Sequence, residues 1–191
     1  MKAREITLCA LFAALMGIGA NVSPLLVIGG VPVTLQLMFA ILAGGILGSR
    51  LGAISMTVYL FVGLVGAPIF AQFKGGPASL LSPTFGFVIS FILVAYLTGK
   101  CLEGKRSWFT YTFAGVLAIS ANYLIGTNYM FLAFKYWVEA PGDFSYLVAW
   151  SWMLAYLPLD LAVTTLSFII IPKMEKAIFR VPVKREKTTA Y

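Results

Sequence analysis

The sequence predicts an all-α membrane protein, a compact bundle of six transmembrane helices that residues 1–191 form as a single domain. Hydrophobic residues make up 60% of the chain and charged residues only 11%, whereas a soluble domain contains about a quarter charged residues. The apolar residues are gathered in long runs, which turn-forming or charged residues separate. Lipid therefore replaces much of the core that a soluble protein of this length would bury.

The first apolar run follows the short basic start MKAR and predicts a helix over residues 6–23. Signal peptides also begin this way, but no polar mature domain follows here. We therefore expect this run to be retained as a membrane span. The next segment, residues 23–34, is apolar but contains two prolines and two glycines, which favours a buried irregular loop over a helix.

The next two runs predict helices over residues 35–49 and 53–71, joined by a tight turn at SRLG, residues 49–52. The first of them is short, because a membrane-spanning helix needs about 20 apolar residues. It either begins within the preceding loop, or is tilted, or is partly buried by its neighbours. Residues 72–81 then form a connection rich in glycine and hydroxyl side chains.

The second half of the chain predicts three longer helices, over residues 82–102, 108–134 and 146–172. A short basic loop, residues 103–107, and an aromatic and acidic loop, residues 135–145, connect them. After Pro172, residues 173–191 predict a basic cytoplasmic tail, either lying on the membrane surface or disordered.

Twelve of the fourteen Lys and Arg residues fall on one side of the membrane if the six helices alternate in direction. Only Lys74 and Lys135 fall on the other side. Because Lys and Arg accumulate in cytoplasmic segments, both termini are predicted to be cytoplasmic, in the cell membrane of a bacterium. The three irregular connections then share the outer face, which favours a site that opens to the outside.

The composition argues against several functions. The chain has two isolated cysteines, Cys9 and Cys101, and no histidine, so we expect no metal or haem cofactor. It lacks a P-loop, a GxSxG nucleophile motif and an HExxH motif, so we expect no enzyme. The net charge of +7 reflects membrane topology rather than nucleic-acid binding.

Asp160 is the one acidic residue inside a predicted span. A carboxylate there is costly and usually faces a cavity or a partner. Function is the favoured interpretation, and a polar contact between helices is the alternative. Asn122 and Tyr123 lie within the fifth predicted span, and Thr34 and Gln36 lie at the outer start of the second. Each of these residues either reads a polar ligand or makes a structural hydrogen bond.

Aromatic residues gather near the outer face, among them Phe73, Phe87 and Trp152. Most aromatic residues there belong to an interfacial belt, although some would line a pocket for a flat or apolar ligand. Lys74 either pairs with an anionic ligand or is solvated. Small residues recur four apart at Ala10 and Ala14, which indicates either internal packing or the docking of an external helix.

Two segments resemble the BioY family, the biotin-binding S components of energy-coupling factor (ECF) transporters. They are GGVPVTLQLMFAILAGGILGSRLGAISMTVYLFVGLVGAPIF and GGPASLLSPTFGFVISF, and the similarity extends over nearly the whole chain. The resemblance implies a six-helix bundle that binds biotin from outside, with the loops 23–34 and 72–81 closing the pocket. It also implies partners: a transmembrane T component, which Ala10 and Ala14 would contact, and two cytoplasmic ATPases.

With biotin as the ligand, Asp160 would accept from the ureido N–H groups and Asn122 would donate to the ureido carbonyl. Lys74 or Lys135 would face the valerate, and Gly75 and Gly76 would let the loop backbone approach. Two residues depart from the family pattern: Val163 stands where a D-x-x-K lysine is common, and Phe87 where tyrosine is frequent. An S component for a different vitamin, or a structural or regulatory membrane protein, are the alternatives.

Overall fold

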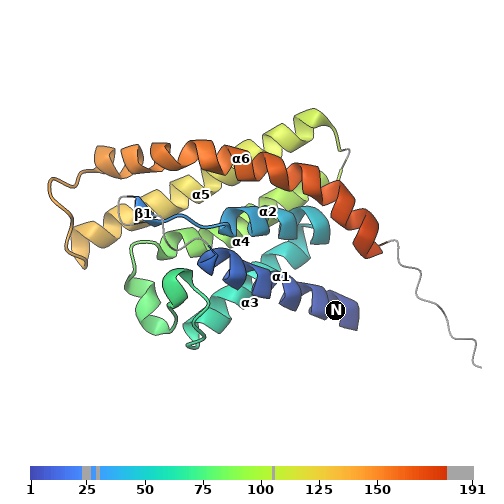
Figure 1. Cartoon of the computed structure of the whole chain (residues 1–191), viewed down its shortest axis with the longest axis horizontal. Helices are drawn as coiled ribbons and strands as arrows, with labels where there is room; N and C mark the ends of the chain where they lie inside the picture. The colour runs from blue at the N-terminus through green and yellow to red at the C-terminus, as the bar shows by residue number, and fades with distance from the viewer. Residues whose placement is uncertain (23–26, 29–30, 105, 180–191) are drawn as a thin grey trace, which may run out of the picture.

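The computed structural model describes residues 1–22, 27–28, 31–104 and 106–179 as a bundle of helices (Figure 1). The long elements are α1 (Ala3–Asn21), α2 (Gln36–Leu47), α3 (Ser49–Leu64), α4 (Phe85–Leu102), α5 (Trp108–Tyr136) and α6 (Tyr146–Phe179). Two 3-10 helices, η1 (Ala71–Phe73) and η2 (Pro77–Leu81), lie between α3 and α4. The strands β1 (Val27–Ile28) and β2 (Val31–Pro32) form a minimal antiparallel hairpin before α2.

The helices pack around α2 and α4. Helix α4 packs against α5, α3 and α2, and α2 in turn packs against α6 (Figure 1). Nearly the whole surface of α2 is buried, from Gln36 to Ile46. At 12 residues, α2 is about 18 Å long, well short of the roughly 30 Å hydrocarbon layer. Protein rather than lipid surrounds it. This agrees with the explanation that neighbouring helices bury the short second helix.

Glycine at position 44 allows α2 and α4 to approach closely. A Cβ atom there would lie 2.1 Å from the Ala95 carbonyl oxygen of α4, and a Cβ atom at Gly52 of α3 would lie 2.8 Å from the Gly44 Cα atom. The small residues of α2 therefore serve internal packing.

Four described helices, α1, α4, α5 and α6, are long and apolar enough to cross a membrane. The all-helical, multi-pass membrane class predicted from the sequence is therefore confirmed. Helix α3, with 16 residues, is about 24 Å long and ends at Leu64, before the predicted residue 71. The chain between Leu64 and α4 instead forms η1, η2 and turns.

Two further predicted boundaries are wrong. SRLG is not a turn, because α3 begins at Ser49 and the turn consists of Gly48 alone, with φ of +84°. Helix α6 does not stop at Pro172 but continues to Phe179. Although proline disfavours a helix interior, Ile171 is fully buried and Met174 and Ile178 pack against the core. The predicted tail thus begins as helix, and residues 180–191 lie outside the described residues.

The start of α1 and the end of α6 lie at the same end of the bundle, where the Arg4 guanidinium donates to the Ile178 carbonyl (Figure 1). At this end Arg106 forms a two-pronged ion pair with Glu175 of α6 and also donates to the Gly45 carbonyl of α2. Connections between α1, α2, α5 and α6 therefore converge here. We call it the termini end.

Glu103, just after α4, caps the start of α3. The backbone N–H and the hydroxyl of Ser49 donate to Glu103 Oε1 at 3.0 and 2.5 Å. These bonds hold the pKa of Glu103 below its ordinary value of about 4.5. A carboxylate at the amino end of a helix also interacts favourably with the helix dipole.

We expect Glu103→Ala to lower the free energy of unfolding by about 1 kcal/mol at pH 7. Because the folded-state pKa is depressed, this stabilisation is complete above about pH 4.5 and is lost as the pH falls through the folded value. Thermal unfolding of the purified protein in detergent at pH 7 and pH 4 measures both effects. Glu139→Ala, in an exposed loop, is the control. An equal loss in both variants, or a loss at pH 4 as large as the loss at pH 7, would contradict the capping role.

Candidate ligand-binding site

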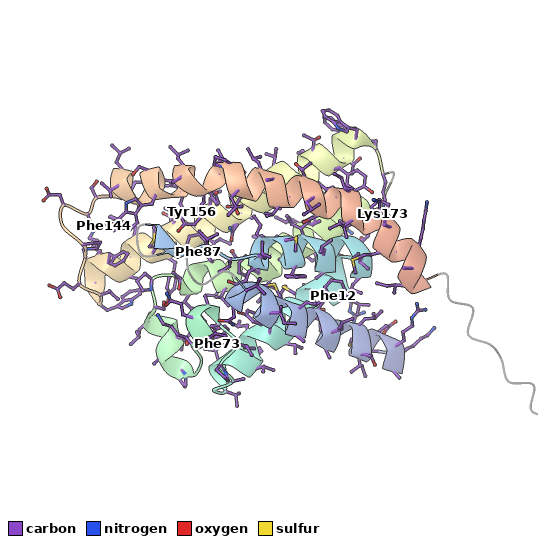
Figure 2. The ribbon with its side chains drawn as sticks, in the orientation of Figure 1. Phe12, Phe73, Phe87, Phe144, Tyr156 and Lys173 are labelled. Atoms are coloured by element: carbon purple, nitrogen blue, oxygen red, sulfur yellow. The ribbon has the colours of Figure 1, made fainter. Side chains whose placement is uncertain are left out.

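A pocket lies in the half of the bundle away from the termini end, where Figure 2 labels Phe87 and Tyr156. It encloses about 840 Å³ of empty space, part of which is open to solvent. Side chains from the start of α2, the segment 70–84, and helices α4, α5 and α6 line it.

Asp160 of α6 and Tyr123 of α5 meet at the pocket wall. The Tyr123 hydroxyl donates to Asp160 Oδ2 at 2.6 Å. Among the described residues, the ion pairs are Lys100–Glu103 and Arg106–Glu175, so neither of them involves Asp160. A hydroxyl donor, rather than a cation, therefore holds this carboxylate, and Val163, one turn further along α6, is a buried apolar residue.

Asn122 is buried beside this pair and is oriented by α4. The Ser90 hydroxyl, itself fully buried, donates to Asn122 Oδ1 at 2.7 Å. With its oxygen engaged, the Asn122 amide keeps its N–H groups as donors, which suits a ligand carbonyl. The site thus combines a carboxylate acceptor with an amide donor.

A chain of hydrogen bonds fixes the segment that carries Phe70 and Lys74 into the pocket. Gln36 Nε2 donates to the Tyr59 hydroxyl at 2.9 Å, which donates to the Ile69 carbonyl at 3.1 Å. The other end of the segment is held by α1, because the backbone N–H of Phe73 donates to Asn21 Oδ1 at 2.8 Å. One N–H of the Gln36 side chain therefore serves to position the pocket wall.

Aromatic rings form the apolar side of the pocket, and glycines make room for them. Phe70 stands edge-on to Tyr59 and to Phe85, with ring centroids 5.4 and 6.2 Å apart. A Cβ atom at Gly63 would lie 2.2 Å from the Phe70 ring, and one at Gly126 would lie 2.1 Å from the Phe87 ring. The positions of both rings thus depend on these two glycines.

The structure brings most of the residues singled out in the sequence to this one pocket. Those that line it are Thr34, Gln36, Lys74, Phe87, Asn122, Tyr123 and Asp160. Phe73 and Gly75 instead line a second, more open hollow of about 970 Å³, which shares Lys74, Ser79 and Ser82 with the pocket. Trp152 lines neither and packs against Phe134 and Phe144.

The glycines of the loop have structural reasons to be there. A Cβ atom at Gly75 would lie 2.2 Å from the Ala67 carbonyl oxygen, so the backbone crosses itself closely. Gly76 has φ of +87° and donates its N–H to the Gly63 carbonyl at 2.7 Å. Gly75 and Gly76 therefore determine the path of the loop backbone.

Sequence reasoning missed several lining residues. Tyr156 and Met153 line the pocket from α6, and their spacing of four and seven residues from Asp160 was the available signal. Ser79, Ser82 and Thr84 also line it, as the hydroxyl-rich composition of that segment could have indicated. Asn21, which holds the backbone of Phe73, does not line the pocket, and nothing in the sequence around it indicated this role.

Helix α1 presents two of its alanines, Ala10 and Ala14, outward. Ala10 and Ala14 are exposed, whereas Ala13 and Gly17 are buried. The exposed pair thus lies on a face of α1 that the other described residues leave open.

Comparisons with known proteins agree on one family. A model of the BioY family matches residues 1–180. Relatives include a putative biotin transporter BioYB from Bacillus subtilis (strain 168), 39% identical over 94% of this chain and 92% of the relative. A probable biotin transporter BioY from Pyrococcus horikoshii is 45% identical over 70% of this chain and 76% of the relative.

Among solved structures, the chain resembles the crystal structure of an S component for biotin from an ECF-type ABC transporter. The TM-score is 0.74 at 22% sequence identity, and the match covers 92% of this chain and 95% of that chain. At this identity, the likeness establishes a shared fold.

Proposed function

The chain belongs to the BioY family, and we propose that it is the substrate-binding S component of an ECF-type vitamin importer, which captures biotin from outside the cell. It is a transporter subunit and not an enzyme, and biotin is its transported ligand rather than a cofactor. The observation that carries the proposal is the pocket in which Asp160, Tyr123 and Asn122 converge with aromatic rings.

The chemistry of the pocket suits biotin. The ureido ring has two N–H donors, for which Asp160 is a charge-assisted acceptor. It also has a carbonyl oxygen, for which Asn122 retains N–H donors because Ser90 occupies its oxygen. Phe70, Phe87 and other apolar side chains of the pocket would pack against the sulfur-containing ring.

Lys74 is the one cation among the lining residues of the pocket in the described part of the chain, and it would face the valerate carboxylate. It also lines the second, more open hollow. This arrangement orders the ligand with its ring inside and its acid towards the mouth. The Tyr123 hydroxyl takes the place of the D-x-x-K lysine in holding Asp160, since Val163 offers no charge.

The membrane topology belongs to the same proposal. Helices α2 and α3 complete six crossings, and both termini face the cytoplasm of a bacterial cell. Two observations support this: Arg4 contacts Ile178, so α1 begins where α6 ends, and twelve of the fourteen Lys and Arg residues lie in sequence segments on the side of the termini. The pocket then opens to the outside.

The energy for uptake would come from partner subunits. A transmembrane T component and two cytoplasmic ATPases would complete the importer, because the sequence lacks a P-loop. The exposed Ala10 and Ala14 of α1 allow a close approach of another helix, so we assign the T component to this face.

The function predicts tight and selective binding. The purified protein in detergent should bind radiolabelled biotin with a dissociation constant of about nanomolar order, and it should not bind riboflavin or thiamine. Equilibrium binding against this panel measures both. Tighter binding of another vitamin would reassign the ligand within the transporter class, and an absence of saturable binding would favour a structural or regulatory protein.

The Asp160 carboxylate should contribute more to biotin affinity than the Lys74 side chain. Because a hydrogen bond to a charged group contributes about 1.5–3 kcal/mol, Asp160→Asn should weaken biotin binding by about 10- to 100-fold. Lys74→Ala, at the mouth, should weaken it less. Asp143→Asn, in an exposed loop, is the matched control, and ligand-free melting temperatures identify general damage. Wild-type affinity in Asp160→Asn would remove this residue from the site.

The docking face should affect transport without affecting binding. The double variant Ala10→Trp and Ala14→Trp should bind biotin normally but lose uptake when the partner subunits are present, because the bulky rings prevent helix contact. The control double variant, Val116→Trp and Leu124→Trp, changes exposed positions of α5 and should transport normally. Normal uptake by the Ala10 and Ala14 variant would show that this face does not dock the T component.

A further inference from the structure

We propose that Tyr129 and Trp137, near the end of α5, latch η2 over the pocket and thereby set the rate at which ligand leaves. The proposal rests on the proposed function for the identity of the ligand, and the contacts that define the latch are independent of it. Neither side chain lines the pocket. Both act through the 3-10 helix that they hold, so they are positioning residues.

The latch consists of two side chains that donate hydrogen bonds to the backbone carbonyls of two consecutive residues. The Trp137 Nε1–H donates to the Leu81 carbonyl at 2.8 Å, and the Tyr129 hydroxyl donates to the Leu80 carbonyl. Carbonyls at the end of a short helix lack partners within that helix, so these donors satisfy acceptors that would otherwise be open. The two rings also contact edge to face, with centroids 5.9 Å apart.

The helix η2 separates the pocket from the outer hollow. Ser79, within η2, and Ser82, directly after it, line both spaces, as does Lys74. A displacement of η2 would therefore join the two spaces into one open path. The ligand carboxylate, placed towards Lys74, would lie directly at this partition.

The helix η2 has little else to hold it. None of its five residues is buried, and Leu80 and Leu81 are 43% and 61% exposed. Its start follows Gly76, whose φ of +87° only glycine adopts readily and whose N–H is fixed to Gly63. With a fixed start and an exposed body, the end of η2 depends on the two donors from α5.

The test removes each donor and keeps an aromatic ring at each position. Trp137→Phe and Tyr129→Phe should each release bound radiolabelled biotin about 3- to 10-fold faster in a chase experiment, as expected for the loss of one hydrogen bond. The association rate should change less than twofold, and the ligand-free melting temperature should match that of the controls. The matched controls are Trp150→Phe, whose ring packs edge-on against Tyr146, and Tyr136→Phe, whose ring lies against the Lys135 ammonium.

Release at the wild-type rate in both latch variants, or equal acceleration in the controls, would overturn the proposal. A second measurement does not need the ligand. A nitroxide attached at Ala78→Cys, an exposed position of η2, in a Cys101→Ser background should become more mobile with Trp137→Phe but not with Trp150→Phe. If the wild type fails to bind biotin and the nitroxide still responds, the latch holds and the proposed function fails. An unresponsive nitroxide overturns the latch in either case.

Discussion

The pocket depends on the hydrogen bond between the Tyr123 hydroxyl and the Asp160 carboxylate, because it lets an acid lie within an apolar bundle. A carboxylate at membrane depth is costly unless protein groups solvate it. Tyr123 supplies that contact from α5 at 2.6 Å, so the two longest helices must pack in the register that joins these residues. The central helix α2 contacts α6, and its first residue, Gln36, lines the same pocket.

The other side of the pocket is held by neutral hydrogen bonds that converge on a short irregular segment. Gln36, Tyr59 and Asn21 come from three different helices and together fix the backbone from Ile69 to Phe73. Irregular backbone within a membrane protein must have its polar groups satisfied by protein or water. The same bonds that satisfy this requirement place Phe70 and Lys74 at the pocket, so the structural and ligand-facing roles of the segment are linked.

Much of the helical arrangement, and the centre of the candidate site, could be predicted because both leave strong signals in an apolar chain. Asp160 and Asn122 stand out where nearly every neighbour is hydrophobic. Aromatic residues carry no such contrast, so Trp152 could not be separated from an interfacial belt, nor Tyr156 recognised as a lining residue. The end of α6 was missed because local proline chemistry predicts a stop at Pro172, whereas the burial of Ile171 and the packing of Ile178 continue the helix.

The two ends of the bundle are held by different kinds of interaction, and this difference determines which end opens more easily. At the termini end, the Arg106–Glu175 ion pair and the Glu103 cap tie four helices together with charged groups. Around the pocket mouth, the described contacts are neutral hydrogen bonds to exposed backbone, as at Leu80 and Leu81. Such bonds contribute less than charge-assisted ones, so opening at the mouth costs less than separating helices at the other end. Opening at the pocket mouth is then a local event, whereas a rearrangement at the termini end involves several helices at once.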